Sequence, residues 1–497
     1  MSRILKSLFI GLSLLYPLAT TAQVLSQNAM MEDYNQFTTI VNNYYALRPQ
    51  LEQKTGIEAN KELNSIGKGI SNAKTAKDFA FIMKQAFAVL NDGHLIFADK
   101  STIILYTKRF GNLASFGNVS LADTLNADRY FKLVYDSIYS QIKCGLRVKY
   151  IDGKYYNVRP FNYNGAKIKE GLEVRAINDI SIDSFVSKYK YHFYDLRWDE
   201  SHRKWYSEMF FLAMPELGIR KFTLTIGENT VTINLAQPLE ILLKEHESMC
   251  SKPFAEVIGK DILYLRIPFM FNEEYYFKLI HDKLNDSITK VVLDVRSNRG
   301  GQDVVWQKIL ESVLAEPVVV RSSIGALNNS PTKRVLNLYN IKDSAEANVS
   351  IGSYKFIEIS ASTDTIKPLQ NNSKIFRKIY VIQDEDTYSA ASSLTSLTPN
   401  SKSMELIGNP PSRIAGRGLT PLIFKLKNSG IVFRMPFTID LSNIENGNSN
   451  PAGNSKIQFN EGINNYLERA LYGNPCSAEY LNSNDKLINY IKLDKPF

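Results

Sequence analysis

The sequence predicts a multidomain protein of mixed α+β and α/β class: a helical N-terminal part, a β-rich middle and an α/β layer in the C-terminal half. Three observations lead to this prediction. A chain of 497 residues is too long for one compact core, so two to four domains are expected. A composition of 44% hydrophobic and 11% aromatic residues is typical of a globular protein. From Asp261 onward strand-like and helix-like stretches alternate, which indicates a largely parallel sheet.

The first 22 residues have the pattern of a signal peptide. Arg3 and Lys6 precede a short apolar run, Leu8 to Leu18, and the small residues Thr20, Thr21 and Ala22 follow it. A transmembrane anchor would need a longer apolar run. We therefore expect a periplasmic or secreted protein without a stable membrane anchor after the leader is removed.

Residues 23–100 are expected to form a helical domain. Its clearest helix begins at Thr75, where Asp78 three residues later suggests a weak capping box. The helix has apolar residues at a spacing of three and four, which are Phe79, Ile82, Met83, Ala86, Phe87 and Leu90. It should end at the turn Asn91-Asp92-Gly93, and His94 follows directly.

Residues 101–250 are expected to be β-rich. The segments Leu146–Tyr150 and Tyr155–Pro160 flank Asp152-Gly153, which is a hairpin signal. Residues Gly171–Asp179 combine a glycine turn, a strand and a polar turn, and Ile219–Ile233 continues with alternating strands. A small β-barrel or sandwich with one helix fits this pattern best.

Residues 251–472 should form the α/β domain, followed by a C-terminal tail, 473–497. The expected elements are the strands Ile262–Ile267, Lys290–Val295, Ile379–Ile382 and Leu406–Ile407, the helices Glu273–Leu284, Gln302–Leu314 and one starting at Ser389, and a closing hairpin, Ile423–Leu426 with Ile431–Met435. Residues 323–373 are polar and rich in Asn and Ser, and we expect them to be an insertion that forms a lid or a substrate-facing loop.

Charge and metal-ligand patterns exclude several function classes. The net charge is +9, or +7 without Arg3 and Lys6, and it is spread out rather than clustered, so no nucleic-acid partner is expected. The five histidines lack HxH or HxxxH spacing, so neither a metal nor another cofactor is expected. The three cysteines, Cys144, Cys250 and Cys476, allow one disulfide, which the sequence does not choose. The oligomeric state is open.

Three short segments at the ends of expected elements carry candidate chemistry. Ser389 stands where a strand turns into a helix, which places its hydroxyl beside free backbone N–H groups. His94 stands at a tight turn, and the pair Gly300-Gly301 follows a buried strand, where it lets backbone N–H groups approach a ligand. Each has a plainer interpretation: a helix N-cap, a surface histidine and an ordinary strand-to-helix turn. All three together favour a serine hydrolase site.

These segments resemble motifs of the C-terminal processing (tail-specific) serine peptidases, which include the tricorn protease core and interphotoreceptor retinoid-binding protein. Phe87–His94 is similar to the family's helix that ends in Asp-Gly-His. Val292–Gly301 is similar to its strand ending in Asp-Leu-Arg-x-Asn-x-Gly-Gly, and Thr387–Ala391 to its Thr-x-Ser-Ala-Ala turn. The resemblance runs over roughly residues 30–472, with the motifs in the family's order.

The resemblance implies a ClpP/crotonase-like catalytic domain in which Ser389 is the nucleophile. The Ser–Lys branch carries its basic lysine in a Gly-Lys-Gly context, where this chain has Gly416-Arg417-Gly418, and arginine cannot act as that base. His94 is therefore the expected base, as in the tricorn-like Ser–His branch. The resemblance also implies an oxyanion hole formed by the backbone N–H groups of Gly300, Gly301 and Ala390.

Other implications of the resemblance are less direct. Glu445 is a positional candidate for the carboxylate that orients the histidine. A PDZ-like domain would span about 140–240 and bind a substrate's C-terminal tail, although an unrelated β module fits that stretch nearly as well. The sequence departs from the family at Ser392, where glutamate is common, at Arg299, where proline is common, and at Gly93, where tricorn-type sites have serine.

The expected function is thus a periplasmic or secreted serine peptidase acting on peptides or protein tails. Two alternatives share its scaffold. One is a catalytically weak or inactive binding protein for a peptide or lipid-like ligand, as the retinoid-binding relative suggests. The other is a serine hydrolase that acts on esters. Fold alone does not separate them.

Overall fold

A computed structural model describes residues 25–494 with short gaps. The gaps are residues 112–116, 140–146, 194, 209–216, 237–238, 243–249, 339–340, 342–347, 370–376, 415–417, 443, 446–447, 450–454, 456, 460–461 and 473. The signal peptide expected over 1–22 and Cys144 therefore lie outside the described residues. None of the helices in the described ranges is long and apolar enough to cross a membrane.

The N-terminal part is helical, but its helices run past residue 100 as far as Tyr139, where the sequence predicts β-rich structure. The prediction for 101–139 is wrong because Ile103 and Tyr106 are buried at helical spacing. Its helices are α1 (Gln27–Tyr44), α2 (Arg48–Thr55), α3 (Ala59–Gly67), α4 (Ala76–Leu90), α5 (Lys100–Phe110) and α6 (Thr124–Tyr139). The capping box between Thr75 and Asp78 is present at the start of α4. The helix ends where Asn91 adopts a left-handed conformation with φ of 46°. The expected turn before His94 is thus confirmed.

A short strand joins this helical part to the C-terminal half. Strand β1 (Ile96–Phe97) pairs antiparallel with β22 (Val432–Met435), which forms a hairpin with β21 (Leu422–Lys425). The Phe87 ring lies 4.8 Å from the Phe97 ring and 5.5 Å from the Phe433 ring, measured between centroids. Because these side chains share one buried core, the segment around His94 is held against the C-terminal half.

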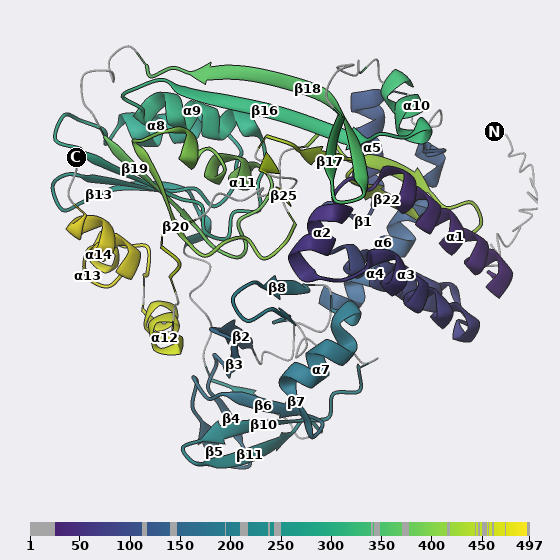
Figure 1. Cartoon of the computed structure of the whole chain (residues 1–497). Helices are drawn as coiled ribbons and strands as arrows, with labels where there is room; N and C mark the ends of the chain where they lie inside the picture. Colours follow the sequence, from purple (N-terminus) through teal and green to yellow (C-terminus); the bar gives the residue numbers. More distant parts are fainter. Residues whose placement is uncertain are drawn as a thin grey trace, which may run out of the picture.

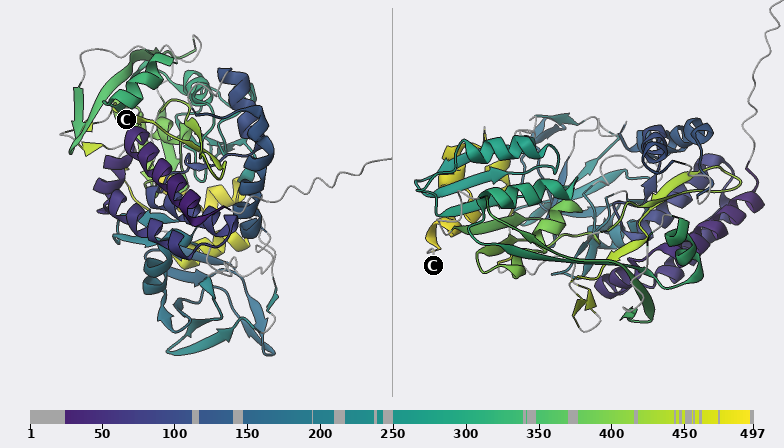
Figure 2. Two further views of the ribbon diagram at one scale, coloured as in Figure 1. Left: turned by 90° about the vertical axis from the view of Figure 1, so that its right-hand side faces the viewer. Right: turned by 90° about the horizontal axis from the view of Figure 1, so that it is seen from above.

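The middle part consists mainly of short antiparallel strands, which gather in a separate lobe at the bottom of Figure 1 and of the left view of Figure 2. Its elements are β2 (Val148–Ile151), β3 (Lys154–Asn157), β4 (Phe161–Tyr163), β5 (Ala166–Ile168), β6 (Val174–Ile177), β7 (Ile180–Ser181), α7 (Ile182–Tyr189), β8 (Arg197–Asp199), β9 (Lys204–Tyr206), β10 (Lys221–Ile226), β11 (Asn229–Asn234) and β12 (Glu240–Ile241). The hairpin predicted at Asp152-Gly153 joins β2 and β3. The largest sheet here has the order β11-β10-β6-β7.

The α/β layer is a five-stranded sheet in the order β13-β14-β15-β19-β20. Its strands are β13 (Phe254–Ile258), β14 (Ile262–Arg266), β15 (Lys290–Asp294), β19 (Lys378–Gln383) and β20 (Met404–Gly408). All neighbouring pairs except β13–β14 are parallel, which confirms the predicted pairing.

Helices cover both faces of this sheet. One face packs against α8 (Glu273–His281), α9 (Asp303–Val313) and α11 (Ala390–Thr395), around the buried Trp306. The other face packs against α13 (Ala478–Ser483) and α14 (Lys486–Leu493), and Figure 1 shows these two sets on opposite sides. The residues expected to be a tail thus include two helices. Parallel strands expose apolar side chains on both faces, and Leu487, Ile488 and Ile491 bury the second one.

The stretch 323–373 differs from the loop expected there. It contains the second half of β16 (Val318–Leu327), together with α10 (Ser330–Leu338), β17 (Asn348–Ile351) and β18 (Tyr354–Ile366). Strands β16 and β18 pair antiparallel along their length and form the long ribbon at the top of Figure 1. Strand β16 also pairs with β23 (Thr438–Asp440), so the ribbon is hydrogen-bonded to the domain and is not a free lid. Among the described residues, the strands and α-helix not yet named are β24 (Ile444–Glu445), β25 (Asn448–Ser449) and α12 (Ile463–Leu471).

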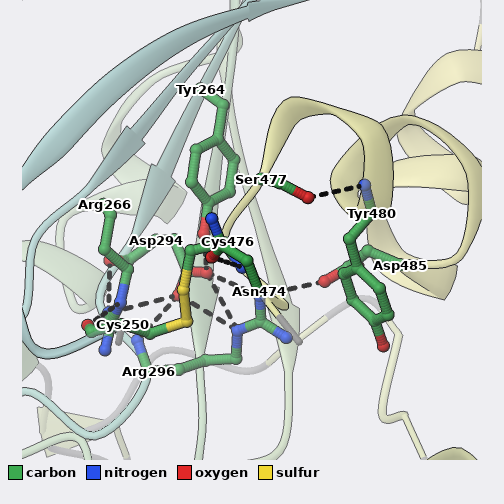
Figure 3. The surroundings of a disulfide bond; sticks show 10 residues. All are labelled: Cys250, Tyr264, Arg266, Asp294, Arg296, Asn474, Cys476, Ser477, Tyr480 and Asp485. Carbon is green, nitrogen blue, oxygen red and sulfur yellow. Dashed lines mark hydrogen bonds and ion pairs between the residues drawn. A yellow bond between two sulfur atoms is a disulfide. The ribbon is translucent and has the colours of Figure 1, made fainter. Parts of the chain in front are cut away.

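One disulfide, between Cys250 and Cys476, ties the start of the sheet to the C-terminal helices across 226 sequence positions. Figure 3 shows it beside a buried ionic cluster. There Asp294 accepts hydrogen bonds from Tyr264 Oη at 2.5 Å and Arg296 Nη2 at 2.6 Å. Arg296 also binds Asp485, which caps α14. Despite burial, the adjacent Arg296 and Arg266 guanidinium groups hold the pKa of Asp294 well below its usual range.

We expect removal of this disulfide to loosen the C-terminal helices. Cross-linking residues so far apart in sequence restricts the unfolded chain, and the double variant Cys250→Ser/Cys476→Ser should lose about 2–5 kcal/mol of stability. Differential scanning calorimetry of this variant, with Cys144→Ser as the control for loss of another cysteine, measures the effect. An unchanged melting temperature in the double variant, or in the oxidised protein after addition of reductant, would contradict the assignment.

Candidate active site

Two neighbouring strands bring two of the three candidate segments together. Strands β15 and β19 pair in parallel with Asp294 opposite Ile382, so the residues that follow them leave the sheet at the same edge. The Tyr388 N–H donates to the Asn298 carbonyl at 2.9 Å, which links the two segments directly. Ser389 and Gly300 are therefore close because of the strand register.

Ser389 precedes α11 in a conformation unusual for a residue with a side chain. Its φ is 56° and its ψ is −126°, and its side chain makes no hydrogen bond to the helix it precedes. The side chain is half-buried. A positive φ of this kind is strained for serine, and strain of this kind concentrates at functional sites. The plain N-cap interpretation therefore fails, because the Ser389 hydroxyl does not cap the helix that it precedes.

Gly300 packs directly against this turn, with φ of 97°. A Cβ atom on Gly300 would lie 2.6 Å from the Ser389 Cβ and 3.0 Å from the Ala390 nitrogen, so only glycine fits. The Gly300 N–H donates to Asn298 Oδ1 at 2.7 Å and is occupied in this structure. A Cβ on Gly301 would lie 2.2 Å from the Met270 carbonyl oxygen. Both glycines thus permit close backbone contacts.

Asn298 and Asp384 fasten the two loops together. The fully buried Asn298 side chain donates to the Ile267 carbonyl at 2.8 Å while it accepts from Gly300. Asp384 accepts from the Ser297 N–H at 2.7 Å and from the Ser297 hydroxyl at 3.0 Å. Asn298 lies in the Val292–Gly301 motif, and the sequence assigns a role to neither residue. Asparagine and aspartate after a strand are common turn residues, so no local signal marks them.

His94 lies against the residue that precedes the nucleophile candidate. Its ring centroid is 4.8 Å from that of Tyr388, and the Tyr388 hydroxyl is 2.9 Å from His94 Nδ1. The same hydroxyl donates to Asp92 Oδ1 at 2.8 Å. Burial lowers the pKa of His94 below its usual value of 6.5; Asp92 opposes this shift and Arg434 adds to it. The imidazole is therefore neutral at pH 7, as a general base must be.

The structure does not bring every residue expected at the site into contact with Ser389. Within the described residues, no hydrogen bond joins Ser389 Oγ to a ring nitrogen of His94. Glu445 lies in β24, and its side chain is outside the described part of the structure, as are Gly416 and Arg417. No group of His, Cys, Asp and Glu side chains suited to a metal ion occurs among the described residues.

A cavity of about 970 Å³ lies between the middle part and the five-stranded sheet. Neither Ser389 nor His94 lines it, but Asp384, Glu385 and Asp386 of the loop before Ser389 do. Asp386 forms ion pairs with Arg197 of the middle part at 3.0 Å and with Arg299 at 3.5 Å. The loop before Ser389 is therefore held from two sides.

We expect Asn298→Ala to destabilise the site and the protein. The change leaves the Ile267 carbonyl and the Gly300 N–H without their present partner in a buried place, which costs about 2–4 kcal/mol. Urea denaturation measures this loss. The control is Asn285→Ala, an exposed turn residue before β15, which should cost less than about 1 kcal/mol. Equal stabilities of the two variants would contradict the role assigned to Asn298.

Comparison with known proteins identifies a family domain in the C-terminal half of the chain. Residues 261–450, about two fifths of the chain, match the model of peptidase family S41. No curated protein matches the chain. Among solved structures, mature CPAF has 13% identity and a TM-score of 0.56, and the match covers 95% of this chain and 99% of that one.

Two further solved structures are similar to different degrees. CPAF complexed with lactacystin has 12% identity and a TM-score of 0.55, with 94% of this chain and 98% of that one covered. The photosystem II D1 C-terminal processing protease has 12% identity and a TM-score of 0.35, too low to carry an argument, over 87% of this chain and 93% of that one. At such identities the CPAF structures show the shared fold alone. The family match shows a peptidase family S41 domain over residues 261–450 and supports a serine-type peptidase.

Proposed function

We propose that this protein is a periplasmic or secreted serine peptidase that cleaves peptides or protein C-terminal tails through an acyl-enzyme on Ser389. The observation that carries the proposal is the Ser389 turn, with a positive φ, a hydroxyl free of the helix and Gly300 packed against it. The leader pattern and the disulfide support export, because disulfides persist in oxidising compartments.

In the proposed mechanism His94 is the general base of the Ser–His branch. A ring nitrogen of His94 takes the Ser389 proton as Oγ attacks the substrate carbonyl carbon. The imidazolium then returns the proton to the leaving amine as the C–N bond breaks. Water repeats the sequence to release the acyl group. The two side chains must approach to hydrogen-bond distance when substrate binds, which is common for catalytic pairs that are loose in the free enzyme.

The oxyanion hole would consist of backbone N–H groups from both loops. Ala390 supplies one at the start of α11, and Gly301 supplies another. Gly300 joins them only if its N–H leaves Asn298 Oδ1, to which it is bonded at 2.7 Å. Donors fixed in place before reaction stabilise the developing negative charge without reorganisation.

The middle part is the proposed tail-binding module. Its four-stranded sheet and the helix α7 are the kinds of element expected of a PDZ-like domain over about 140–240. Such a module would hold a substrate's C-terminal tail as an added strand. Glu445 stays a candidate for the carboxylate that completes the site.

A second candidate function is a catalytically weak binding protein on the same scaffold. The observation that favours it is that Ser389 and His94 are not hydrogen-bonded to each other in the described structure. A fluorophosphonate probe, which reacts only with an activated serine, separates the two functions. Labelling of Ser389, located by peptide mass spectrometry, supports the peptidase, and absence of labelling favours the binding protein.

We expect Ser389→Ala to abolish peptide hydrolysis while the fold is kept. Loss of the nucleophile should lower kcat at least about 10³-fold, and His94→Ala should be nearly as damaging. Hydrolysis of peptides by the purified variants measures both effects. Ser396→Ala, in the same part of the chain but bonded to its own turn, is the matched control and should keep its activity. Normal turnover by Ser389→Ala would overturn the mechanism.

The pH dependence of kcat/KM should reflect the protonation of the His94 imidazole. Because burial lowers the pKa of His94, the base is in its active form throughout the neutral range and is lost only as pH falls below about 6.5. The acidic limb of kcat/KM against pH should therefore have its midpoint below that value. A midpoint well above 7 would contradict a half-buried, neutral His94 as the base.

A further inference from the structure

Asp92 is the centre of a buried hydrogen-bond cluster beside His94. Its side chain is fully buried. Asp92 Oδ1 accepts from the backbone N–H of His94 at 2.8 Å and from the Tyr388 hydroxyl at 2.8 Å. Tyr45 reaches the other oxygen, Oδ2, at 3.3 Å. A buried carboxylate with several donors is held in one orientation, so Asp92 is a fixed acceptor.

The Tyr388 hydroxyl has one proton and two side-chain partners, Asp92 and His94, while the Gly93 backbone N–H donates toward its oxygen. A carboxylate can only accept, so the proton must lie between Tyr388 Oη and Asp92 Oδ1; otherwise two acceptor oxygens would face each other at 2.8 Å. The tyrosine oxygen is then left as an acceptor toward His94 Nδ1, 2.9 Å away. His94 Nδ1 must therefore carry the imidazole hydrogen, and Nε2 must carry the lone pair.

We propose that Tyr388, hydrogen-bonded to Asp92, is a positioning residue that holds His94 in the tautomer with Nε2 free to accept the Ser389 proton. The inference rests on the proposed function and names the orienting group that the sequence leaves open. In a serine hydrolase triad a carboxylate usually does this directly. Here the Nδ1–Asp92 Oδ1 distance is 3.8 Å, too long for a hydrogen bond, and the phenol bridges the gap.

Gly93 makes room for the bridge. A Cβ at this position would lie 3.2 Å from Cε1 and Cζ of the Tyr388 ring, closer than side chains normally approach. A serine before the histidine, as in tricorn-type sites, would therefore push the ring away. Glycine at position 93 and tyrosine at position 388 are therefore sterically linked.

The arrangement also joins the base to the nucleophile. Tyr388 directly precedes Ser389, and its backbone N–H is anchored on the Asn298 carbonyl at 2.9 Å. A shift of this segment thus moves the nucleophile and the support of the base together. Three further groups face this cluster from other elements. Burial lowers the pKa of His94, and Arg434 of β22 lowers it further. Burial raises the pKa of Tyr388, and Arg413, whose Nη1 would lie 3.5 Å from a Cβ on Gly93, opposes that rise. Burial likewise raises the pKa of Tyr45, and Arg48 opposes that rise.

Tyr388→Phe tests the proposal, because it removes only the bridging hydroxyl. We expect kcat to fall about 10- to 100-fold, a part of the 10²–10⁴-fold that general base catalysis contributes, with KM changed less than about threefold. The acidic limb of kcat/KM should also move to lower pH, because the imidazolium loses a hydrogen-bond acceptor while its burial persists. A purely structural role would not move that limb.

Tyr34→Phe is the control. It removes a phenol hydroxyl that donates to the Leu63 carbonyl at 2.6 Å, from a buried ring outside the Asp92 cluster, so its kcat should fall less than about threefold and its acidic limb should stay in place. Equal losses in both variants, or an unmoved limb in Tyr388→Phe, would overturn the proposal. If Ser389→Ala still hydrolyses peptides, the proposed function fails instead, which is a separate result.

Nitrogen-15 NMR of the histidine rings tests the tautomer without relying on activity. The chain has five histidines, and His94→Gln identifies the His94 signals. In the Ser389→Ala background we expect a protonated Nδ1 and an unprotonated Nε2 at pH 7.5, and a mixture of tautomers once Tyr388→Phe is added. A protonated Nε2 in the presence of Tyr388 would overturn the proposal even if the peptidase function holds.

Discussion

The parallel pairing of β15 with β19 is the constraint on which the candidate site depends. In this pairing the carboxyl ends of the two strands meet at one edge of the sheet, so the segments that follow them must leave side by side. The Gly300 loop and the Ser389 turn are therefore neighbours before any side chain of the site interacts. Asn298 then fixes their separation, because its carbonyl accepts from one segment and its side chain binds the other.

The third segment of the site arrives by hydrophobic burial rather than by sheet register. His94 and Tyr388 are 294 positions apart, and their contact depends on β1 pairing with β22 beside a shared aromatic core. Buried aromatic rings stabilise a contact between segments so far apart in sequence more than exposed polar contacts would. The base is thus supported by the core of the N-terminal helices.

The C-terminal residues stabilise the sheet from its other face. Strands that are apolar on both faces need a packing layer on each face, and α14 supplies the second layer with Leu487, Ile488 and Ile491. The Cys250–Cys476 disulfide and the Arg296–Asp485 ion pair attach this cover near the carboxyl end of β15. The loop that carries Gly300 therefore begins from a strand end that is held on both faces.

The sequence by itself determined the elements and the turns that end them, because helix periodicity, capping residues and glycine turns are local signals. The capping box at Thr75, the parallel strands and the turn at Ser389 followed from such signals. It did not predict the β16–β18 ribbon or the C-terminal helices. Their apolar patterns are short, and these elements are stabilised by strand pairing and by packing on the sheet. Nor did it predict the Asp92–Tyr388–His94 contacts. Only the tertiary structure decided these, because hydrogen bonds between side chains of distant segments leave no periodic trace in the chain.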